Sequence, residues 1–580
     1  MKRSEAVLEA PAETETPSGG RLRPLPIRST VRLNRASDIW HKPAFSAATA
    51  LLIPQLVLLA VGRLDLAVHT SAGSMCALYA HSLPYAVRAR TLLWVIAGML
   101  AGFGVALTTA ALTDSGPLLV LGAALVAAAH KMLCDATRIG PPGNLIFTFI
   151  AAGGFFLPQR LSDVPFHLFL ALLGGVVAWL VCMAPGLVRP HGPERIAVAR
   201  ALEAAAGLLR TPAGDAEAVA RARGAAAAAV NAAWHTLFLV GGRSSASAAS
   251  RAGLERLLVR AESAAHGPTG AAAEAEAGRL AVWAHDLRKN RPLPRVALTS
   301  EQSDELTGIA VDRAAHRPRG VRAVPGRLRP GSPLLPIGLR VAVGCALAGW
   351  ASMGLGVGHP YWAVVVAASV FQANTVLSWQ RAVQRVLGSF PGLLVFALVL
   401  PLARAGDLAL ILLVFLAQVG AEALIPRNYW LGTICVTSLA LLLTEFGERR
   451  PAEELIGDRL IDTLLGAVLG LLVCLLVVNR PAGGRVEKAL RQVERAREDA
   501  LRPVADTPEA RREADRTVGR LTAALVELRD ATETASGEWW LRALPRERIA
   551  AAEREGHRAL ADLGRRLDAL GVPAPAERQN

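Results

Sequence analysis

Residues 333–392 decide the fold: PLLPIGLRVAVGCALAGWASMGLGVGHPYWAVVVAASVFQANTVLSWQRAVQRVLGSFPG. Two apolar segments, Ile337–Leu355 and Tyr361–Leu377, follow one another across a turn that contains glycine and proline. They have 19 and 17 residues and almost no charge, which is long enough to cross a hydrocarbon core about 30 Å thick. We therefore expect this stretch to span a membrane, with a third span beginning near Gly388.

The rest of the chain alternates between similar apolar stretches and strongly polar ones. The mean hydropathy is +0.35 although 19% of the residues are charged, so the charges are concentrated in separate blocks. This is typical of a polytopic membrane protein with soluble appendages. The formal net charge is +15, but the arginines are not interleaved with aromatic residues. We therefore expect no nucleic-acid partner, and a basic face that meets the anionic heads of the lipid bilayer.

This alternation predicts an all-α fold with two transmembrane halves of six helices each, arranged as parallel repeats. The predicted parts are a polar cytoplasmic N-terminal tail (1–41), a first transmembrane half (42–188), a cytoplasmic helical domain (189–332), a second transmembrane half (333–479) and a C-terminal cytoplasmic helical domain (480–580). The predicted spans are 44–61, 66–86, 91–112, 117–134, 144–158 and 166–188, then 337–355, 361–377, 386–403, 407–425, 429–445 and 460–478. Gly98 and Gly102 lie 290 positions before Gly388 and Gly392, which favours a diverged duplication.

Arginine is dense in the long polar segments next to the spans and absent from the short loops at 113–116 and 356–360. Loops rich in arginine stay in the cytoplasm, so both termini and both helical domains should be cytoplasmic in a cell-membrane protein. The arginines of 446–459 depart from this trend. The first 40 residues lack the apolar core of a signal peptide, so we expect the first span to direct insertion.

The cysteines and lysines argue against a metal cofactor and against ATP hydrolysis. Each cysteine stands alone in or beside an apolar segment, without a C-x-x-C pair, so neither a disulfide framework nor a zinc site is expected. His130 and Cys134 have helical spacing, but two ligands do not make a metal site. No lysine stands in a G-K-[ST] motif, and neither G-x-S-x-G nor H-E-x-x-H occurs. We expect no cofactor and no enzymatic activity.

Four motifs occur in a fixed order: LRVAVGCALAGWASMGLGVGHPYWAVVVAASVFQ, RAVQRVLGSFPG, NYWLGTICVTSLALLL and DRLIDTLLGAVLGLLV. This order resembles the fusaric acid resistance family of integral membrane transporters. That family is similar to the aromatic acid exporters and, more distantly, to the plant aluminium-activated malate transporters. The resemblance implies two six-helix halves and export of small carboxylic acids. The family pattern falls on Arg340, Tyr361, Trp362, Arg381, Arg385, Gly388, Asn428, Tyr429, Arg459, Asp462 and Gly466.

The first half resembles the family only weakly. It has no good counterpart of the Arg459–Asp462 pair, and His167 is the nearest polar residue in its sixth predicted span. This asymmetry argues against two equivalent sites.

Asp458 and Asp462 lie one helical turn apart, on one face with Gly466 and Gly470. A desolvated carboxylate can take up a proton or pair with arginine, so Asp462 is a candidate for coupling transport to protons. In the alternative interpretation, Asp458 lies in the outer loop and Asp462 caps the start of a helix. The glycines would then let neighbouring helices approach closely.

Arginine and aromatic side chains are candidates for binding an anionic substrate. Arg381 and Arg385 suit a carboxylate, although lipid phosphate at the cytoplasmic end of a span would use them equally well. The side chains of Tyr361, Trp362 and Tyr429 lie at predicted span ends, where aromatic belts form, but they could also stack on an aromatic substrate.

Four further polar residues interrupt the predicted spans, and they should face the interior of the bundle because lipid cannot satisfy them. They are Gln372, Asn374, Gln418 and Glu422. They either hydrogen-bond between helices or line a polar path.

The sequence therefore predicts a transporter that exports small organic acids, aromatic carboxylic acids in particular, or related toxic compounds, driven by the proton gradient. A passive organic-anion channel and a membrane scaffold acting through its cytoplasmic helices are the alternatives. The expected partners are the lipid bilayer and a small organic anion, and a homo-oligomer is left open.

Overall fold

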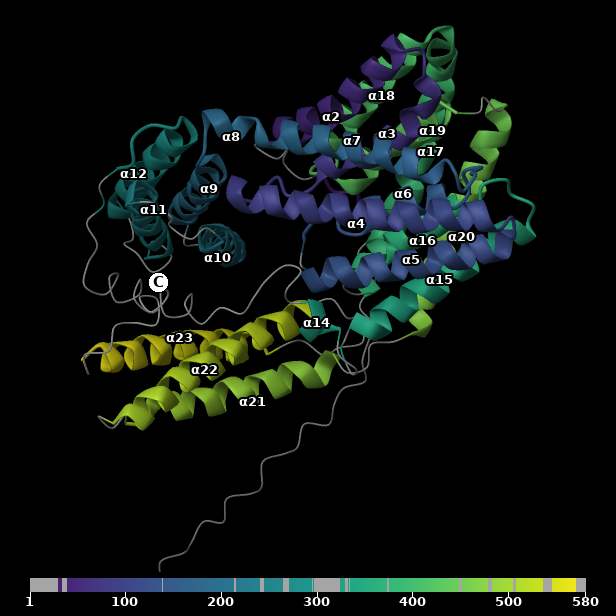
Figure 1. Ribbon diagram of the computed structural model, residues 1–580. Helices are drawn as coiled ribbons and strands as arrows, with labels where there is room; N and C mark the ends of the chain where they lie inside the picture. Colours follow the sequence, from purple (N-terminus) through teal and green to yellow (C-terminus); the bar gives the residue numbers. More distant parts are fainter. Residues whose placement is uncertain are drawn as a thin grey trace, which may run out of the picture.

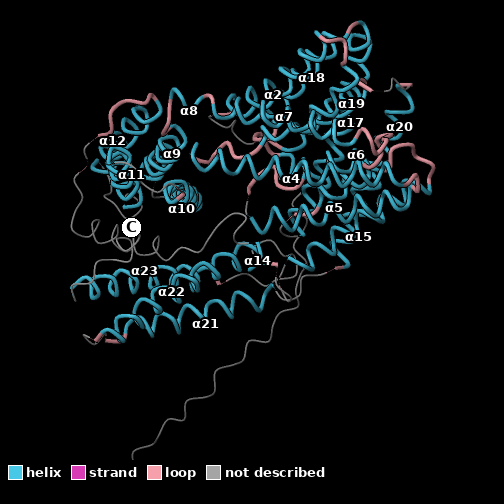
Figure 2. Tube along the Cα trace, in the orientation of Figure 1, coloured by secondary structure: helices cyan, strands magenta, loops and turns pink. Residues whose placement is uncertain are grey.

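The computed structural model describes residues 30–33, 39–137, 139–212, 215–239, 245–263, 271–294, 296, 324–328, 332, 334–372, 375–447, 451–477, 482–503, 507–535 and 545–569. Within these ranges every regular element is a helix and there is no strand (Figure 2). The predicted all-α fold is confirmed.

The first half of the apolar part consists of six consecutive elements. They are α2 (His41–Ala60), the broken run of η1 (Leu64–Leu66), α3 (Ala67–Ser74) and η2 (Met75–Leu78), then α4 (Tyr85–Leu112), α5 (Gly116–Thr137), α6 (Leu145–Gly154) and α7 (Val164–Met183). The single turn α8 (Pro185–Val188) continues α7. The second half repeats this order with α15 (Leu334–Gly354), α16 (Tyr361–Val370), α17 (Thr375–Ala405), α18 (Asp407–Leu424), α19 (Tyr429–Thr444) and α20 (Ala452–Leu476).

Eight helices of the described chain are long and apolar enough to cross a membrane, which confirms a polytopic membrane protein. They are α2, α4, α5, α7 with α8, α15, α17, α18 and α20. The apolar helices α6, α16 and α19 are shorter, with 10, 10 and 16 residues. The short elements therefore occupy the second and fifth positions of each half.

Two predicted spans are not continuous helices. The stretch 66–86 breaks into η1, α3 and η2, and Tyr79 then continues in extended conformation. The stretch 361–377 ends as a helix at Val370, because Phe371 turns to extended backbone at φ −69° and ψ 98°. The Gln372 backbone N–H then donates to Ser378 Oγ at 3.0 Å. The apolar composition predicted two continuous spans here, because it carries no information about the breaks.

The helices pack in the same pattern in both halves. Helix α3 packs on α7 as α16 packs on α20, and α4 packs on α6 as α17 packs on α19. Between the halves the contacts are reciprocal, because α15 packs along α5 and α2 packs along α18. The first helix of each half therefore lies on the fourth helix of the other.

Glycine makes the closest of these contacts possible. A Cβ at Gly466 of α20 would lie 2.6 Å from the carbonyl oxygen of Ala363 in α16, which no real Cβ tolerates. In the first half, a Cβ at Gly174 of α7 would meet the carbonyl oxygen of Thr70 in α3. These two glycines place the short helix against the sixth helix in each half.

We expect Gly466→Ala to lower the free energy of unfolding of the detergent-purified protein by about 1–3 kcal/mol, because α16 must move away to admit the methyl group. The matched control is Gly153→Ala in α6, where a Cβ meets no atom within 4 Å. That change should be neutral or stabilise by up to about 1 kcal/mol through reduced backbone entropy. Equal melting temperatures for the two variants would contradict the close contact.

Two helical bundles flank the apolar part. The first contains α9 (Gly192–Leu209), α10 (Ala216–Phe238), α11 (Ser245–Ser263) and α12 (Ala271–Arg288), and the second contains α21 (Ala482–Leu501), α22 (Pro508–Ala535) and α23 (Arg546–Ala569). Each has its own core of leucine, alanine and valine side chains. Both lie to the left of the apolar helices in Figure 1, and the single turn α14 (Val324–Arg327) lies near α5.

Candidate functional site

Arg459 is the centre of a charged cluster inside the second half. It projects from α20 and is only 1% exposed, although it carries a full positive charge. Its guanidinium lies over the ring of Trp362 from α16, 5.0 Å from the ring centroid. Among the described residues, its Nε and Nη1 atoms have no hydrogen-bond partner. Burying a cation with unused N–H donors is costly unless a further group compensates it.

Two more guanidinium groups come from α17. Arg385 is 2% exposed and its Nη1 donates to the hydroxyl of Tyr429, at 3.4 Å. The Nε of Arg385 has no acceptor in the described part of the chain. Arg381, one turn earlier, stacks on the ring of the same Tyr429. Its guanidinium carbon is 3.8 Å from the ring centroid. Arg385 is also close enough to Arg459 for the two charges to repel.

Asp462 supplies a negative charge to this cluster. It is 0% exposed, and its Oδ1 accepts a hydrogen bond of 2.6 Å from the hydroxyl of Ser352 in α15. No donor of the described chain reaches its Oδ2, and it attracts Arg459 electrostatically. Arg459 therefore has one buried carboxylate, Asp462, and a second buried guanidinium, that of Arg385, as charged neighbours.

Asp458 lies one turn nearer the start of α20 and has a different role. It accepts hydrogen bonds from His359 Nδ1, at 2.8 Å, and from the Gly358 backbone N–H, at 3.1 Å. The His359 ring stacks on Trp362 with a centroid separation of 4.5 Å. Asp458 thus holds the loop before α16 and, through His359, orients the indole that Arg459 contacts.

The structure corrects three alternatives that the sequence left open. Helix α20 begins at Ala452, so Asp458 lies inside the helix rather than in a loop, and Asp462 does not cap the helix start. Arg385 is buried, so its guanidinium does not reach lipid phosphate.

The other predicted site residues lie outside the Arg459 cluster. Arg340 donates from Nη2 to the carbonyl of Val477 and so ties α15 to the end of α20. Gln372 donates to the carbonyl of Ser369, at 3.0 Å, within the break after α16. On α18, Gln418 is buried and Glu422 is half-buried. Asn374 lies outside the described residues.

Asn428 connects the second half to the chain before α2. Its Oδ1 accepts from the Trp430 backbone N–H, at 3.2 Å, and so caps α19. Its Nδ2 donates to the carbonyls of Thr30 and Arg32, at 3.0 Å each. Residues 30–32 are therefore held next to Tyr429.

Sequence analysis missed Ser352 and His359, which position the two aspartates. Their partners lie 110 and 99 residues away along the chain, so no local pattern could reveal them. The one signal was the motif G-H-P-Y-W, in which a histidine precedes the aromatic pair.

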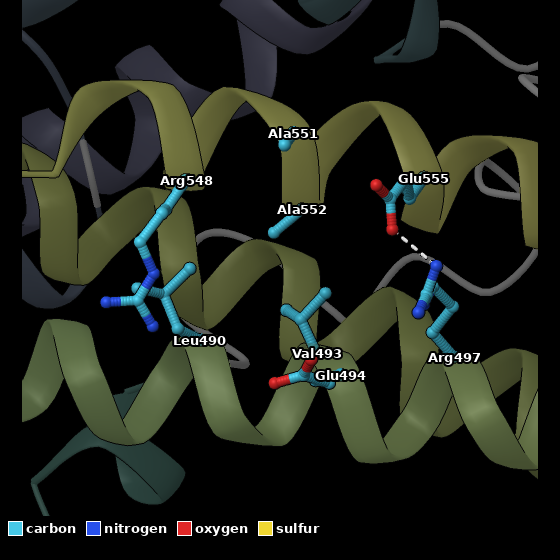
Figure 3. Close-up of a pocket in the computed structure, with 8 residues that line it drawn as sticks. All are labelled: Leu490, Val493, Glu494, Arg497, Arg548, Ala551, Ala552 and Glu555. Carbon is cyan, nitrogen blue, oxygen red and sulfur yellow. Dashed lines mark hydrogen bonds and ion pairs between the residues drawn. The ribbon is translucent and has the colours of Figure 1, made fainter. Parts of the chain in front are cut away.

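Two other places in the described chain lack the features of a binding site. Within the described residues, no group of three or more metal-ligating side chains occurs, and Lys131 pairs with Asp135 at 3.0 Å. A groove of about 190 Å³ lies between α21 and α23 of the C-terminal bundle (Figure 3). There Arg497 already pairs with Glu555, so the groove lacks the uncompensated charge that marks the Arg459 cluster.

Buried ionisable side chains between short and long apolar helices are the hallmark of helical membrane transport proteins. Residues 344–473 match the family model described as fusaric acid resistance protein-like, so this part of the chain is similar to that family. The match contains Trp362, Arg385, Arg459 and Asp462. The family resemblance of the sequence is thereby confirmed, whereas the link to aluminium-activated malate transporters stays a prediction.

Two curated proteins are similar to this chain. The uncharacterised membrane protein YvaC of Bacillus subtilis (strain 168) is 26% identical over 555 residues, which is 90% of this chain and 84% of YvaC. The uncharacterised protein slr1298 of Synechocystis sp. (strain ATCC 27184 / PCC 6803 / Kazusa) is 31% identical over 140 residues, or 24% of this chain and 18% of slr1298. No solved structure matches the chain significantly.

Proposed function

We propose that this protein is a secondary transporter that binds a small aromatic carboxylate between Arg385 and Arg459 and exports it in exchange for protons. The observation that carries the proposal is the pair of buried guanidinium groups with unused N–H donors. A carboxylate would accept from both groups and neutralise the excess charge, and arginine is well suited to this because of its planar donor fork.

The aromatic side chains around the cluster support an aromatic substrate. Trp362 is flanked by the His359 ring at 4.5 Å and the Arg459 guanidinium at 5.0 Å, and the Tyr361 ring centroid is 5.5 Å from its own. An arene whose carboxylate meets Arg385 and Arg459 would contact this aromatic wall. Aliphatic carboxylates of the same charge would lose that contact and bind more weakly.

The depth of the cluster supports transport rather than surface binding. Arg385 is the eleventh residue of α17 and Asp462 the eleventh of α20. At 1.5 Å per residue each lies about 15 Å from its helix start, which is close to the midplane of a core about 30 Å thick. Substrate sites at this depth, next to discontinuous helices, are typical of alternating-access transporters.

The proposal includes the predicted topology of two parallel six-helix halves with cytoplasmic bundles in the cell membrane. The repeated packing pattern supports the two halves, and the position of both bundles on one side in Figure 1 supports a common compartment. The arginine-rich flanks make that compartment the cytoplasm.

The test uses the purified full-length chain in liposomes loaded with radiolabelled benzoate. We expect benzoate efflux that an acidic outside accelerates, and competition by salicylate but not by acetate at equal concentration. Efflux no faster than from protein-free liposomes, under any pH gradient, would contradict the proposal.

A passive anion channel is the second candidate, because an excess of buried positive charge also favours anion permeation. It would give a benzoate current that depends on voltage and is unaffected by a pH gradient. Planar-bilayer recordings with equal and unequal pH on the two sides separate the two functions.

A further inference from the structure

The first half contains a counterpart of the Arg459–Trp362 pair that the sequence does not reveal. The contact of Gly174 with Thr70 corresponds to the contact of Gly466 with Ala363. The two glycines are 292 positions apart, and Thr70 and Ala363 are 293 apart. The same two offsets relate His167 of α7 to Arg459 and His69 of α3 to Trp362.

The two histidines repeat the contact as well as the positions. The His69 and His167 rings stack with centroids 3.8 Å apart and planes inclined by 21°, as the Arg459 guanidinium stacks on Trp362. His69 is 8% exposed, and within the ranges that the structure describes neither ring nitrogen has a hydrogen-bond partner. Nδ1 of His167 is 2.9 Å from Gln159 Oε1. A buried imidazole without partners in the described chain thus stands beside one that is only half-buried.

Two acidic groups attract a positive charge on the pair, whereas burial of both rings and the repulsion of His69 by His167 oppose it. Asp65 lies one turn before His69 and pairs with Arg63 at 3.0 Å, and Asp163 lies one turn before His167. Both carboxylates attract the respective imidazolium.

The helices packed around the pair add no further charge. Helix α4 contributes Phe103, 6.3 Å from His69 between ring centroids. Of its two arginines, Arg88 bonds to the distant carbonyls of Ala80 and Cys182, and Arg90 is exposed. Helix α2 has no charged residue from Pro43 to Ala60 and contributes Gln55, which donates to Ser71.

We propose that His69 and His167 form a proton-binding site, loaded from the membrane side opposite the helical bundles. Helix α7 leads through α8 into α9, so its first turns, with His167, lie at the end away from the bundle. Water delivers a proton to the free nitrogen lone pair of an imidazole. Two stacked imidazolium ions would repel each other, so the pair takes up one proton at a time. The inference rests on the proposed function, and it assigns anion binding to the second half and proton loading to the first.

The experiment compares the wild-type chain with the double variant His69→Gln/His167→Gln in benzoate-loaded liposomes. Wild-type efflux should rise about tenfold per unit of falling external pH until the site saturates, as for one titrating histidine. The double variant should vary less than about twofold over that range, while benzoate exchange without a gradient continues because Arg385 and Arg459 are intact. The matched control is His285→Gln on the exposed face of α12, which should keep the wild-type profile.

A second variant and a direct measurement of protonation distinguish loss of the proton site from misfolding of the double variant. His69→Trp/His167→Arg installs the side chains of the second half, so it should fold, exchange benzoate and lack the external pH dependence. Nitrogen-15 NMR of histidine-labelled protein in liposomes should show imidazole protonation in the wild type that both variants lack.

A wild-type pH profile in the double variant, or identical histidine titrations, would overturn the proton site. If the wild type moved no benzoate, the proposed function would fail, and the NMR titration alone would then decide the proton site.

Discussion

Arg459→Gln will lower benzoate efflux about 100-fold and raise the melting temperature of the ligand-free protein. Truncating a buried charge that pairs with a ligand typically costs 2–5 kcal/mol of binding, and about 1.4 kcal/mol corresponds to tenfold. The same substitution removes a buried cation whose Nε and Nη1 lack acceptors in the described structure, so the empty protein should gain stability. The measurements are benzoate flux in liposomes and thermal unfolding in detergent.

Ligand-dependent stability sharpens this prediction. Benzoate at about 100 times its Kd should stabilise the wild-type protein by about 2.7 kcal/mol and leave the Arg459→Gln variant unchanged. The control is Arg90→Gln, at an exposed position of α4, which should preserve both flux and benzoate stabilisation. Equal benzoate stabilisation of wild type and Arg459→Gln would place the anion elsewhere.

Asp462→Asn will abolish efflux driven by a proton gradient without preventing membrane insertion. Asparagine keeps the shape of the side chain, and its Oδ1 can still accept the Ser352 hydrogen bond of 2.6 Å. It cannot exchange a proton, and it leaves Arg459 without its buried counter-charge. Benzoate should therefore bind at least as tightly as in the wild type but leave slowly.

The measurement is benzoate efflux with an acidic or a neutral outside, together with the yield of protein in the membrane fraction. Asp114→Asn is the matched control, because Asp114 lies exposed in the loop after α4. Gradient-driven efflux at the wild-type rate in Asp462→Asn would remove this carboxylate from the mechanism.

Much of the architecture could be predicted from the sequence because apolar length and arginine placement are local properties. The helices α2, α5, α7, α15, α18 and α19 lie close to their predicted spans. The break after Val370 could not be predicted, since it depends on the Ser378 contact of Gln372 across the turn. Hydropathy carries no information about such a contact.

The candidate site was predictable only in part. The spacing of Arg459 and Asp462 and the family motifs indicated the right helix, but burial of Arg385 depends on the packing of α17 against α19 and α20. His167 was noted only as the nearest polar residue of its predicted span, and His69 was not predicted at all, because both side chains differ from those at the corresponding positions of the second half.

The reciprocal contact of α2 with α18 and of α15 with α5 also bears on ancestry. A polypeptide with only one set of six helices would leave its opening helix uncovered, unless a twin molecule offered its own fourth helix. Such a half-length ancestor would have been an obligate dimer, and gene fusion would have joined its two subunits covalently. If the chain is split between the two halves, the co-expressed fragments should therefore associate, whereas either fragment expressed alone should aggregate or be degraded.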